Sequence, residues 1–150
     1  MNAVQLLKND HREVNALFGK VKATEDDQEK RELFLQIKTE LDTHTHIEET
    51  IFYPKLKEKE ELKDITLEGI EEHHQAKMFL RELSNLVDDS EKFEPKLKVL
   101  MEDIIHHVQE EEGEMFPKVE ELFSEAELTE LGTQMEAEKK TFKKSLTAKA

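Results

Sequence analysis

The chain is organised around the stretch HTHIEETIFYP at residues 44–54, which has a partner, HVQEEEGEMFP, at residues 107–117. Both stretches follow the pattern His-x-x-x-Glu-Glu-x-x-x-aromatic-Pro, and the step from position 44 to position 107 is an offset of 63 residues. The same offset relates His11 to His74. This repeat, which needs no gap, predicts that one structural unit occurs twice in the chain.

The composition favours a mostly helical protein. The 150 residues are enough for one compact domain with a sizeable core. Charged residues make up 39% of the chain, and only 4 glycines and 3 prolines occur, as is typical of helices with solvated outer faces. We therefore expect a single domain over residues 1–150, with its core at about residues 3–140.

Charge and composition also argue against several classes of protein. The net charge of −14 argues against partners with a phosphate backbone and against anionic membranes. The absence of cysteine excludes disulfides and thiolate metal sites. No apolar run approaches the ~18–20 residues that span a bilayer, and the N-terminus lacks the apolar segment of a secretory signal. We expect a cytoplasmic protein without nucleic-acid or membrane partners, present as a monomer or a weak homo-oligomer.

The spacing of apolar residues predicts four long helices. They are expected at about residues 3–24, 26–57 and 64–87, and from before Leu97 to about Met115. A capping-box pattern at 124–127 should open a short fifth helix, and the basic tail at 139–150 should fray. Short connections make successive helices antiparallel neighbours. The expected fold is all-α: an up-down-up-down four-helix bundle, built from a duplicated helical hairpin, with a short C-terminal fifth helix.

Each copy of the motif places a histidine and a glutamate on the inner face of its helix. Residues four apart lie one above the other on a helix, so His44 and Glu48 point into the same space. His107 and Glu111 do the same from another helix. Imidazole nitrogens and carboxylate oxygens are ligands of non-haem iron, manganese and zinc.

The two remaining helices each add one histidine, His11 from the first and His74 from the third. On the third helix the periodicity alone does not exclude the adjacent His73, and only the repeat selects His74. Six buried polar groups without partners would cost ~1–3 kcal/mol each, which together is comparable with the ~5–15 kcal/mol net stability of a domain. Two bound metal ions would remove that cost. The candidate metal ligands are His11, His44, Glu48, His74, His107 and Glu111.

Other polar residues near the motif receive simpler interpretations. His46, His73 and His106 stand next to proposed ligands and are expected at the surface or in support of a ligand. Glu49 and Glu112 are expected to face solvent, with ligation as the less favoured alternative. Tyr53 is expected to fill the core.

The chain resembles the hemerythrin-like, or HHE cation-binding, domain family over about residues 3–140. The resemblance rests on DHRE at 10–13, on EHH at 72–74 and on the two copies of the motif. It implies a non-haem di-iron centre with an oxo or hydroxo bridge, two iron ions as cofactor, and the same six residues as ligands.

The sequence departs from the oxygen-carrying hemerythrins, which have a fifth histidine one turn away on the third helix. Ile70 and Met78 stand at those positions around His74. The chain is thus similar to the four-histidine, two-glutamate variety, which is associated with iron or oxygen sensing, responses to nitric oxide and peroxide, and repair of iron centres.

We therefore expect a di-iron protein that binds or senses dioxygen, nitric oxide or peroxide at a carboxylate-bridged centre. Its partner would be a small diatomic ligand or peroxide, and four apolar residues are expected to supply a dry pocket for it: Ile47, Ile51, Ile104 and Val108. Two alternatives remain open. One is a di-iron enzyme acting on peroxide or oxygen, catalase-like or oxidase-like, and the other is an iron-holding or iron-centre repair protein.

Overall fold

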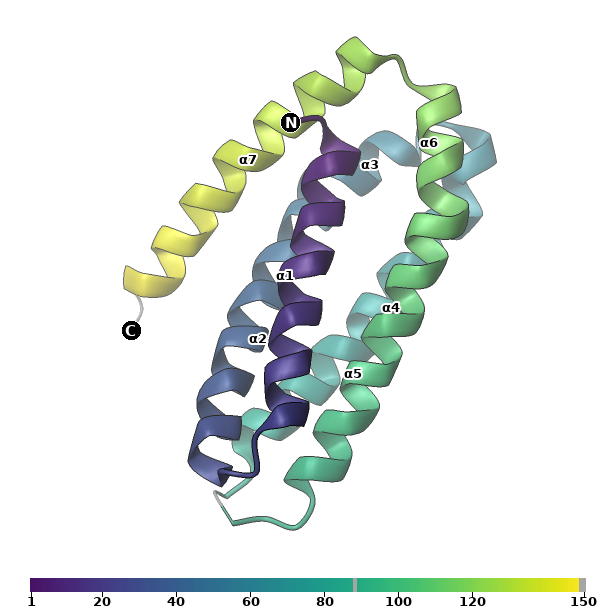
Figure 1. The fold of residues 1–150 in the computed structure, drawn as a ribbon. Helices are drawn as coiled ribbons and strands as arrows, with labels where there is room; N and C mark the ends of the chain where they lie inside the picture. The colour runs from purple at the N-terminus through teal and green to yellow at the C-terminus, as the bar shows by residue number, and fades with distance from the viewer. Residues whose placement is uncertain (88, 149–150) are drawn as a thin grey trace.

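The computed structural model describes residues 1–87 and 89–148, and these contain helices and no strand (Figure 1). Helices α1 and α2 form one antiparallel hairpin, α4 and α5 form the second, and α7 packs across α1 and α2. This confirms the predicted all-α bundle with an additional C-terminal helix. In chain order the elements are α1 (Ala3–Ala23), α2 (Asp27–Ile47), η1 (Glu48–Phe52), α3 (Tyr53–Leu56), α4 (Glu60–Asn85), α5 (Phe93–Glu110), η2 (Glu111–Met115), α6 (Phe116–Leu122) and α7 (Glu125–Ala148).

Polar side chains fix the starts of three helices. Asn2 opens α1 with a capping box, and the Asp26 carboxylate accepts bonds from two backbone N–H groups of the first turn of α2. At the start of α7, the Glu127 N–H donates to Ser124 Oγ and the Ser124 N–H donates to Glu127 Oε1. Each cap satisfies N–H groups that have no partner inside their own helix, so the predicted starts of α2 and α7 are confirmed.

The two prolines of the motif do not end their helices. Before Pro54 the helix widens into the π-helical turn η1, in which the Tyr53 N–H bonds to the carbonyl of Glu48, five residues back. The second copy repeats this from Glu111 to Phe116. Proline supplies no N–H and its ring crowds the preceding turn, and the wider turn gives the ring room. The motif glutamates therefore stand where each helix changes its winding.

The apolar core is divided into two clusters by a layer of polar side chains. One cluster, around Leu7, Phe52 and Phe116, lies where α3, α6 and the first half of α7 meet. The other, around Phe34 and Leu97, fills the opposite end of the bundle.

Among the described residues, no helix is long and apolar enough to cross a membrane.

Helix α4 is turned by about one residue from the orientation that the sequence predicted. Leu67 and Met78, which share a helical face with the predicted ligand His74, are 43% and 53% exposed. The inner face instead carries small residues, including Gly69 and Ala76. A Cβ atom at Gly69 would lie 3.1 Å from the hydroxyl of Tyr53, so the missing side chain makes room for the tyrosine ring. Packing against Tyr53 therefore sets the rotation of α4.

Helix α7 is longer than predicted and remains helical to Ala148. It lies against the start of α1, where a Cβ atom at Gly132 would stand 2.4 Å from the carbonyl oxygen of the first residue. Farther along, Lys139 and Lys143 form ion pairs with the bundle. The expectation that the chain frays from Lys139 onward is thus wrong up to Ala148, and residues 149–150 lie outside the described part.

Candidate metal centre

Four histidines and two glutamates meet in the middle of the bundle, all of them buried. They come from all four bundle helices and from the two π turns, and they separate the two apolar clusters. We call this set the His/Glu layer: His11, His44, Glu48, His73, His107 and Glu111.

Each motif brings its own histidine and glutamate together, as the spacing predicted. His44 Nε2 lies 3.2 Å from Glu48 Oε1, and His107 Nε2 lies 3.1 Å from Glu111 Oε2. These pairs span one helical turn, from the last turn of the α-helix to the first residue of the π turn. The two pairs face each other across the bundle.

The histidines of the other two helices complete the layer, and each lies next to the glutamate of the opposite hairpin. His11 Nε2, from α1, lies 3.2 Å from Glu111 Oε1, whereas His73 Nε2, from α4, lies 3.1 Å from Glu48 Oε1. Each glutamate therefore stands between histidines of two different helices. Each glutamate could therefore help to hold a cation together with the imidazoles beside it.

The predicted position of His74 in this layer is wrong. Its side chain is 58% exposed and lies near Glu71 at the surface, whereas the side chain of the preceding His73 is 4% exposed. The offset of 63 residues holds from His44 to His107, but from His11 to His73 it is 62. Because α4 is turned toward Tyr53, its inner face carries His73. Five of the six predicted residues do meet in the layer.

A carboxylate supports each of the four histidines from outside. His11 Nδ1 lies 2.6 Å from Glu112, His44 Nδ1 lies 3.1 Å from Asp10, His73 Nδ1 lies 2.9 Å from Glu49 and His107 Nδ1 lies 2.7 Å from Glu72. In every case the carboxylate belongs to a different helix from the histidine. We call these four the outer carboxylates: Asp10, Glu49, Glu72 and Glu112.

The helical pattern in the sequence does not reveal this role, and it predicted that Glu49 and Glu112 face solvent. A signal was present, because four of the six inner residues have an acidic neighbour: Asp10 precedes His11, Glu72 precedes His73, and a second glutamate follows each motif glutamate. The helical stripe could not reveal the partners, which lie on other helices. By contrast, His46 and His106 stay outside the layer, as His74 does: His106 pairs with Glu110 and His46 pairs with Glu138 of α7.

The outer carboxylates decide which ring nitrogen faces the centre. An Nδ1–H that donates to a carboxylate leaves the Nε2 lone pair directed inward. Inside the layer, that lone pair then meets a carboxylate oxygen, which also only accepts. Buried polar atoms there have no hydrogen-bond partner among the described residues: Nε2 of His11, His44 and His107, both oxygens of Glu48, and Oε1 of Glu111. Inward acceptors without a donor are the surroundings that a cation needs, so these residues fit a metal.

Without a metal, protons take the place of the cation. Burial opposes a charge on His44, but Glu48 and Asp10 outweigh it and raise the pKa of its imidazole to about 10. Burial likewise opposes a charge on His107, and Glu111 raises its pKa well above the usual value. The pKa of Glu111 is held well below its usual range, against its burial, by the charges of His107 and His11. The layer therefore holds positive charge strongly.

Tyr53 breaks the twofold repeat at the edge of the layer. Its hydroxyl donates to Glu111 Oε2 at 2.6 Å and lies 3.4 Å from His73 Nε2. Burial, together with the negative charges of Glu111 and Glu48, raises the pKa of this phenol well above its usual value, so it keeps its proton. At the equivalent position Phe116 stacks on His11 and has no hydroxyl. Tyr53 is thus a buried proton donor as well as part of the core.

Comparison with known proteins agrees with this geometry. Residues 2–119 match the hemerythrin HHE cation-binding domain. The chain belongs to this family. A solved structure of a hemerythrin HHE cation-binding domain-containing protein from Mycobacterium kansasii is similar to it with a TM-score of 0.84 and 28% identity, covering 99% of this chain and 91% of that one.

Two relatives of this chain are longer proteins. An uncharacterized hemerythrin-like protein from Schizosaccharomyces pombe is 29% identical over 133 residues, which are 87% of this chain and 66% of that protein. A protein named DNA nickase from Nostoc sp. (strain PCC 7120) is 26% identical over 150 residues, which are 100% of this chain and 42% of that protein. The chain therefore corresponds to part of each relative.

Membership of the HHE family indicates cation binding, typically of iron, and the structure supplies side chains that could hold it. One group consists of Glu48, His73, His107 and Glu111, and a second joins His11 and His44 to the same Glu111. The two groups share a glutamate. The layer therefore contains two overlapping groups of side chains that could hold a cation.

Proposed function

We propose that this chain is a non-haem di-iron protein that binds or senses dioxygen, nitric oxide or peroxide. The observation that carries the proposal is the set of buried Nε2 and carboxylate atoms that point at one another without a donor. Four imidazoles and two carboxylates suit iron. When bound, the iron pair would supply open coordination positions and redox chemistry, because six residues do not fill two octahedral shells.

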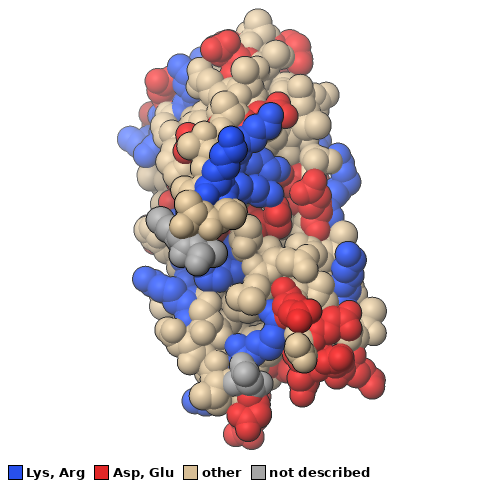
Figure 2. Space-filling view, turned by 90° about the vertical axis from the view of Figure 1, so that its left-hand side faces the viewer, with Lys and Arg blue, Asp and Glu red and all other residues tan. Residues whose placement is uncertain are grey.

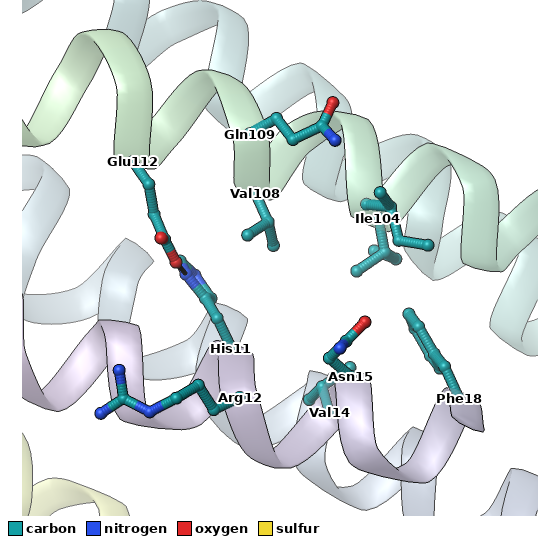
Figure 3. Close-up of a pocket in the computed structure, with 10 residues that line it drawn as sticks. His11, Arg12, Val14, Asn15, Phe18, Ile104, Val108, Gln109 and Glu112 are labelled. Atoms are coloured by element: carbon teal, nitrogen blue, oxygen red, sulfur yellow. Dashed lines mark hydrogen bonds and ion pairs between the residues drawn. The ribbon is translucent and has the colours of Figure 1, made fainter. Parts of the chain in front are cut away.

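A hollow beside the layer supports access for a small ligand. It has a volume of about 210 Å³ and lies between α1 and α5, with the His11 imidazole and Glu112 at one end (Figure 3). Ile104 and Val108, which the sequence predicted for a dry pocket, line it, whereas Ile47 and Ile51 pack in the apolar cluster near α3. An apolar lining favours neutral ligands such as dioxygen and nitric oxide.

The experiment that tests the proposal is a metal analysis followed by optical spectra. Protein made with iron supplied is expected to hold about two irons per chain, because the ligand set is duplicated, and to show near-ultraviolet absorption from a bridged pair. Addition of dioxygen, nitric oxide or peroxide should change the visible spectrum. A stoichiometry near one, or zinc in place of iron under iron-replete conditions, would refute the paired centre. An unchanged spectrum would favour an iron-holding role.

Tyr53 favours a second candidate, an enzyme acting on peroxide, because the chain itself places a proton donor against Glu111. We expect Tyr53→Phe to keep both irons, since Phe116 occupies the equivalent position in the other half. Peroxide consumption should fall by roughly 10²-fold or more, the usual contribution of a positioned acid. Rates and iron content would be measured together. Equal rates in both proteins would exclude Tyr53 as the proton donor, and no turnover by the wild type would exclude the enzyme.

The name of the Nostoc relative raises the question of nucleic acid. That name describes the whole Nostoc protein, of which this chain covers 42%. A net charge of −14 opposes contact with a phosphate backbone, whose binding depends on lysine and arginine. The partners that we propose are instead a small diatomic ligand or peroxide, taken up by a monomer or a weak homo-oligomer.

A further inference from the structure

A lysine of α7 is connected to the His/Glu layer by way of one of the outer carboxylates. Lys139 Nζ lies 2.5 Å from Asp10 Oδ1, and the other oxygen of Asp10 lies 3.1 Å from His44 Nδ1. The side chain of Asp10 is 4% exposed and that of Lys139 is 20% exposed. The three groups thus form a connected chain from the surface of α7 to a residue whose Nε2 faces the centre. Figure 2 shows lysine and arginine side chains gathered on the face where α7 lies.

A second lysine makes the same kind of connection in the other half of the bundle. Lys77 Nζ lies 2.9 Å from Glu49 Oε2, which also lies 2.9 Å from His73 Nδ1. Among the described residues, no lysine forms an ion pair with the other two outer carboxylates, Glu72 and Glu112. Each half of the layer therefore has one histidine whose supporting carboxylate is paired with a lysine.

Because the Asp10 carboxylate is buried, loss of its lysine partner would leave its charge uncompensated. A buried carboxylate oxygen that loses its partner keeps its charge in a poorly solvated place. Without Lys139, Asp10 would hold its position only through His44, and its full negative charge would act on the imidazole. The imidazole would then be less firmly oriented and more electron-donating toward the centre.

We infer that Lys139 is a positioning residue for His44 and acts through Asp10. Through this connection, α7 contributes to the metal centre. The inference rests on the proposed di-iron function and adds to it. The family match ends at residue 119, before α7 begins. Lys139 therefore has a role that this match does not assign.

Contacts other than the Lys139 ion pair also hold α7 against the bundle. The first half of the helix is held by its buried residues Leu128, Leu131 and Met135, and by the close approach of Gly132 to the start of α1. A change at position 139 should therefore leave the fold intact while it alters the centre.

Lys143 provides a matched control one turn farther along the same helix. Its Nζ lies 2.9 Å from Glu40 Oε1, so it also ties α7 to the bundle by an ion pair. Among the described residues, Glu40 forms no hydrogen bond or ion pair with any residue of the His/Glu layer. A loss of helix docking would affect both lysine variants alike, whereas a path through Asp10 would affect only Lys139.

The test uses the full chain loaded with iron, comparing the wild type with Lys139→Met, Lys143→Met and Lys139→Arg. Readouts are the rate of iron release to a chelator, the affinity for cobalt(II), the reduction potential and the far-ultraviolet circular dichroism. Lys139→Met is expected to lower the affinity for one of the two metals by about 10–100-fold, the usual effect of a residue that supports a ligand, and to lower the potential because a positive charge is lost. Lys139→Arg should retain most of the metal affinity and most of the reduction potential. Lys143→Met should match the wild type in both.

The outcomes separate this inference from the proposed function. A wild-type protein that takes up no metal would overturn both. A wild type with two metals, combined with identical release rates and potentials for Lys139→Met and Lys143→Met, would overturn the role of Lys139 alone. Loss of helical structure in Lys139→Met but not in Lys139→Arg or Lys143→Met would also count against it, because the lysine would then act on the fold.

Discussion

His73→Ala is expected to strip the protein of its metal pair, whereas His74→Ala keeps it. His73 is buried, and its Nε2 lies 3.1 Å from Glu48, so its removal deletes a donor from the centre. It also leaves Glu49 without the imidazole that it supports. His74 is exposed and paired only with Glu71 among the described residues. Iron content should fall from about two to at most about one per chain in His73→Ala, together with the near-ultraviolet absorption.

The two substitutions are matched controls for each other, because they make the same change at neighbouring positions of one helix. Retention of both irons by His73→Ala would contradict the observed rotation of α4. Loss of iron by His74→Ala would restore the 63-residue repeat as the guide to the ligands. A parallel contrast is expected for His44→Ala against His46→Ala, since His46 packs on α7 through Glu138 and Phe142.

Metal removal is expected to lower the stability of the protein by several kcal/mol. Unpartnered buried polar groups cost ~1–3 kcal/mol each, and ion pairs between protonated histidines and glutamates recover part of that cost in the metal-free protein. For a chain of this size, each kcal/mol corresponds to about 2–4 °C in Tm. We expect the iron-loaded protein to melt on the order of 10 °C above the chelator-treated protein at neutral pH. Equal midpoints would mean that the layer is held together without metal.

The free energy of unfolding should depend on pH differently in the metal-free and the metal-loaded protein. In the metal-free protein the pKa of His44 is raised to about 10, against burial, by Glu48 and Asp10. A raised pKa stabilises the folded state fully below the unfolded value of ~6.5, and this contribution is lost as the pH rises toward 10. The free energy of unfolding of the metal-free protein should therefore decrease over that range.

Metal binding opposes this trend, because each histidine must lose its proton before its Nε2 can bind. The loaded protein should gain stability relative to the metal-free form as the pH rises, and acid should release the metal. Denaturant unfolding at several pH values, with iron and with chelator, measures both curves. Parallel curves would contradict competition between protons and metal at the layer.

Local patterns in the sequence were sufficient for most of the fold. The apolar periodicity gave the four bundle helices, and the cap residues marked the starts of α2 and α7. The spacing of four residues in His44–Glu48 and His107–Glu111 placed each pair on one face. These features depend on one helix at a time, so the sequence carries them directly.

The rotation of α4 and the support of the histidines depend on contacts between helices. On α4 the sequence offered two adjacent histidines, and Tyr53 against Gly69 decided between them. The outer carboxylates and Lys139 come from helices other than those of the histidines they support. The sequence by itself therefore determined an all-α bundle with a repeated histidine and glutamate motif. Only the tertiary structure decided which α4 histidine faces inward and which charges surround the centre, because side-chain packing between helices fixes how each helix is turned.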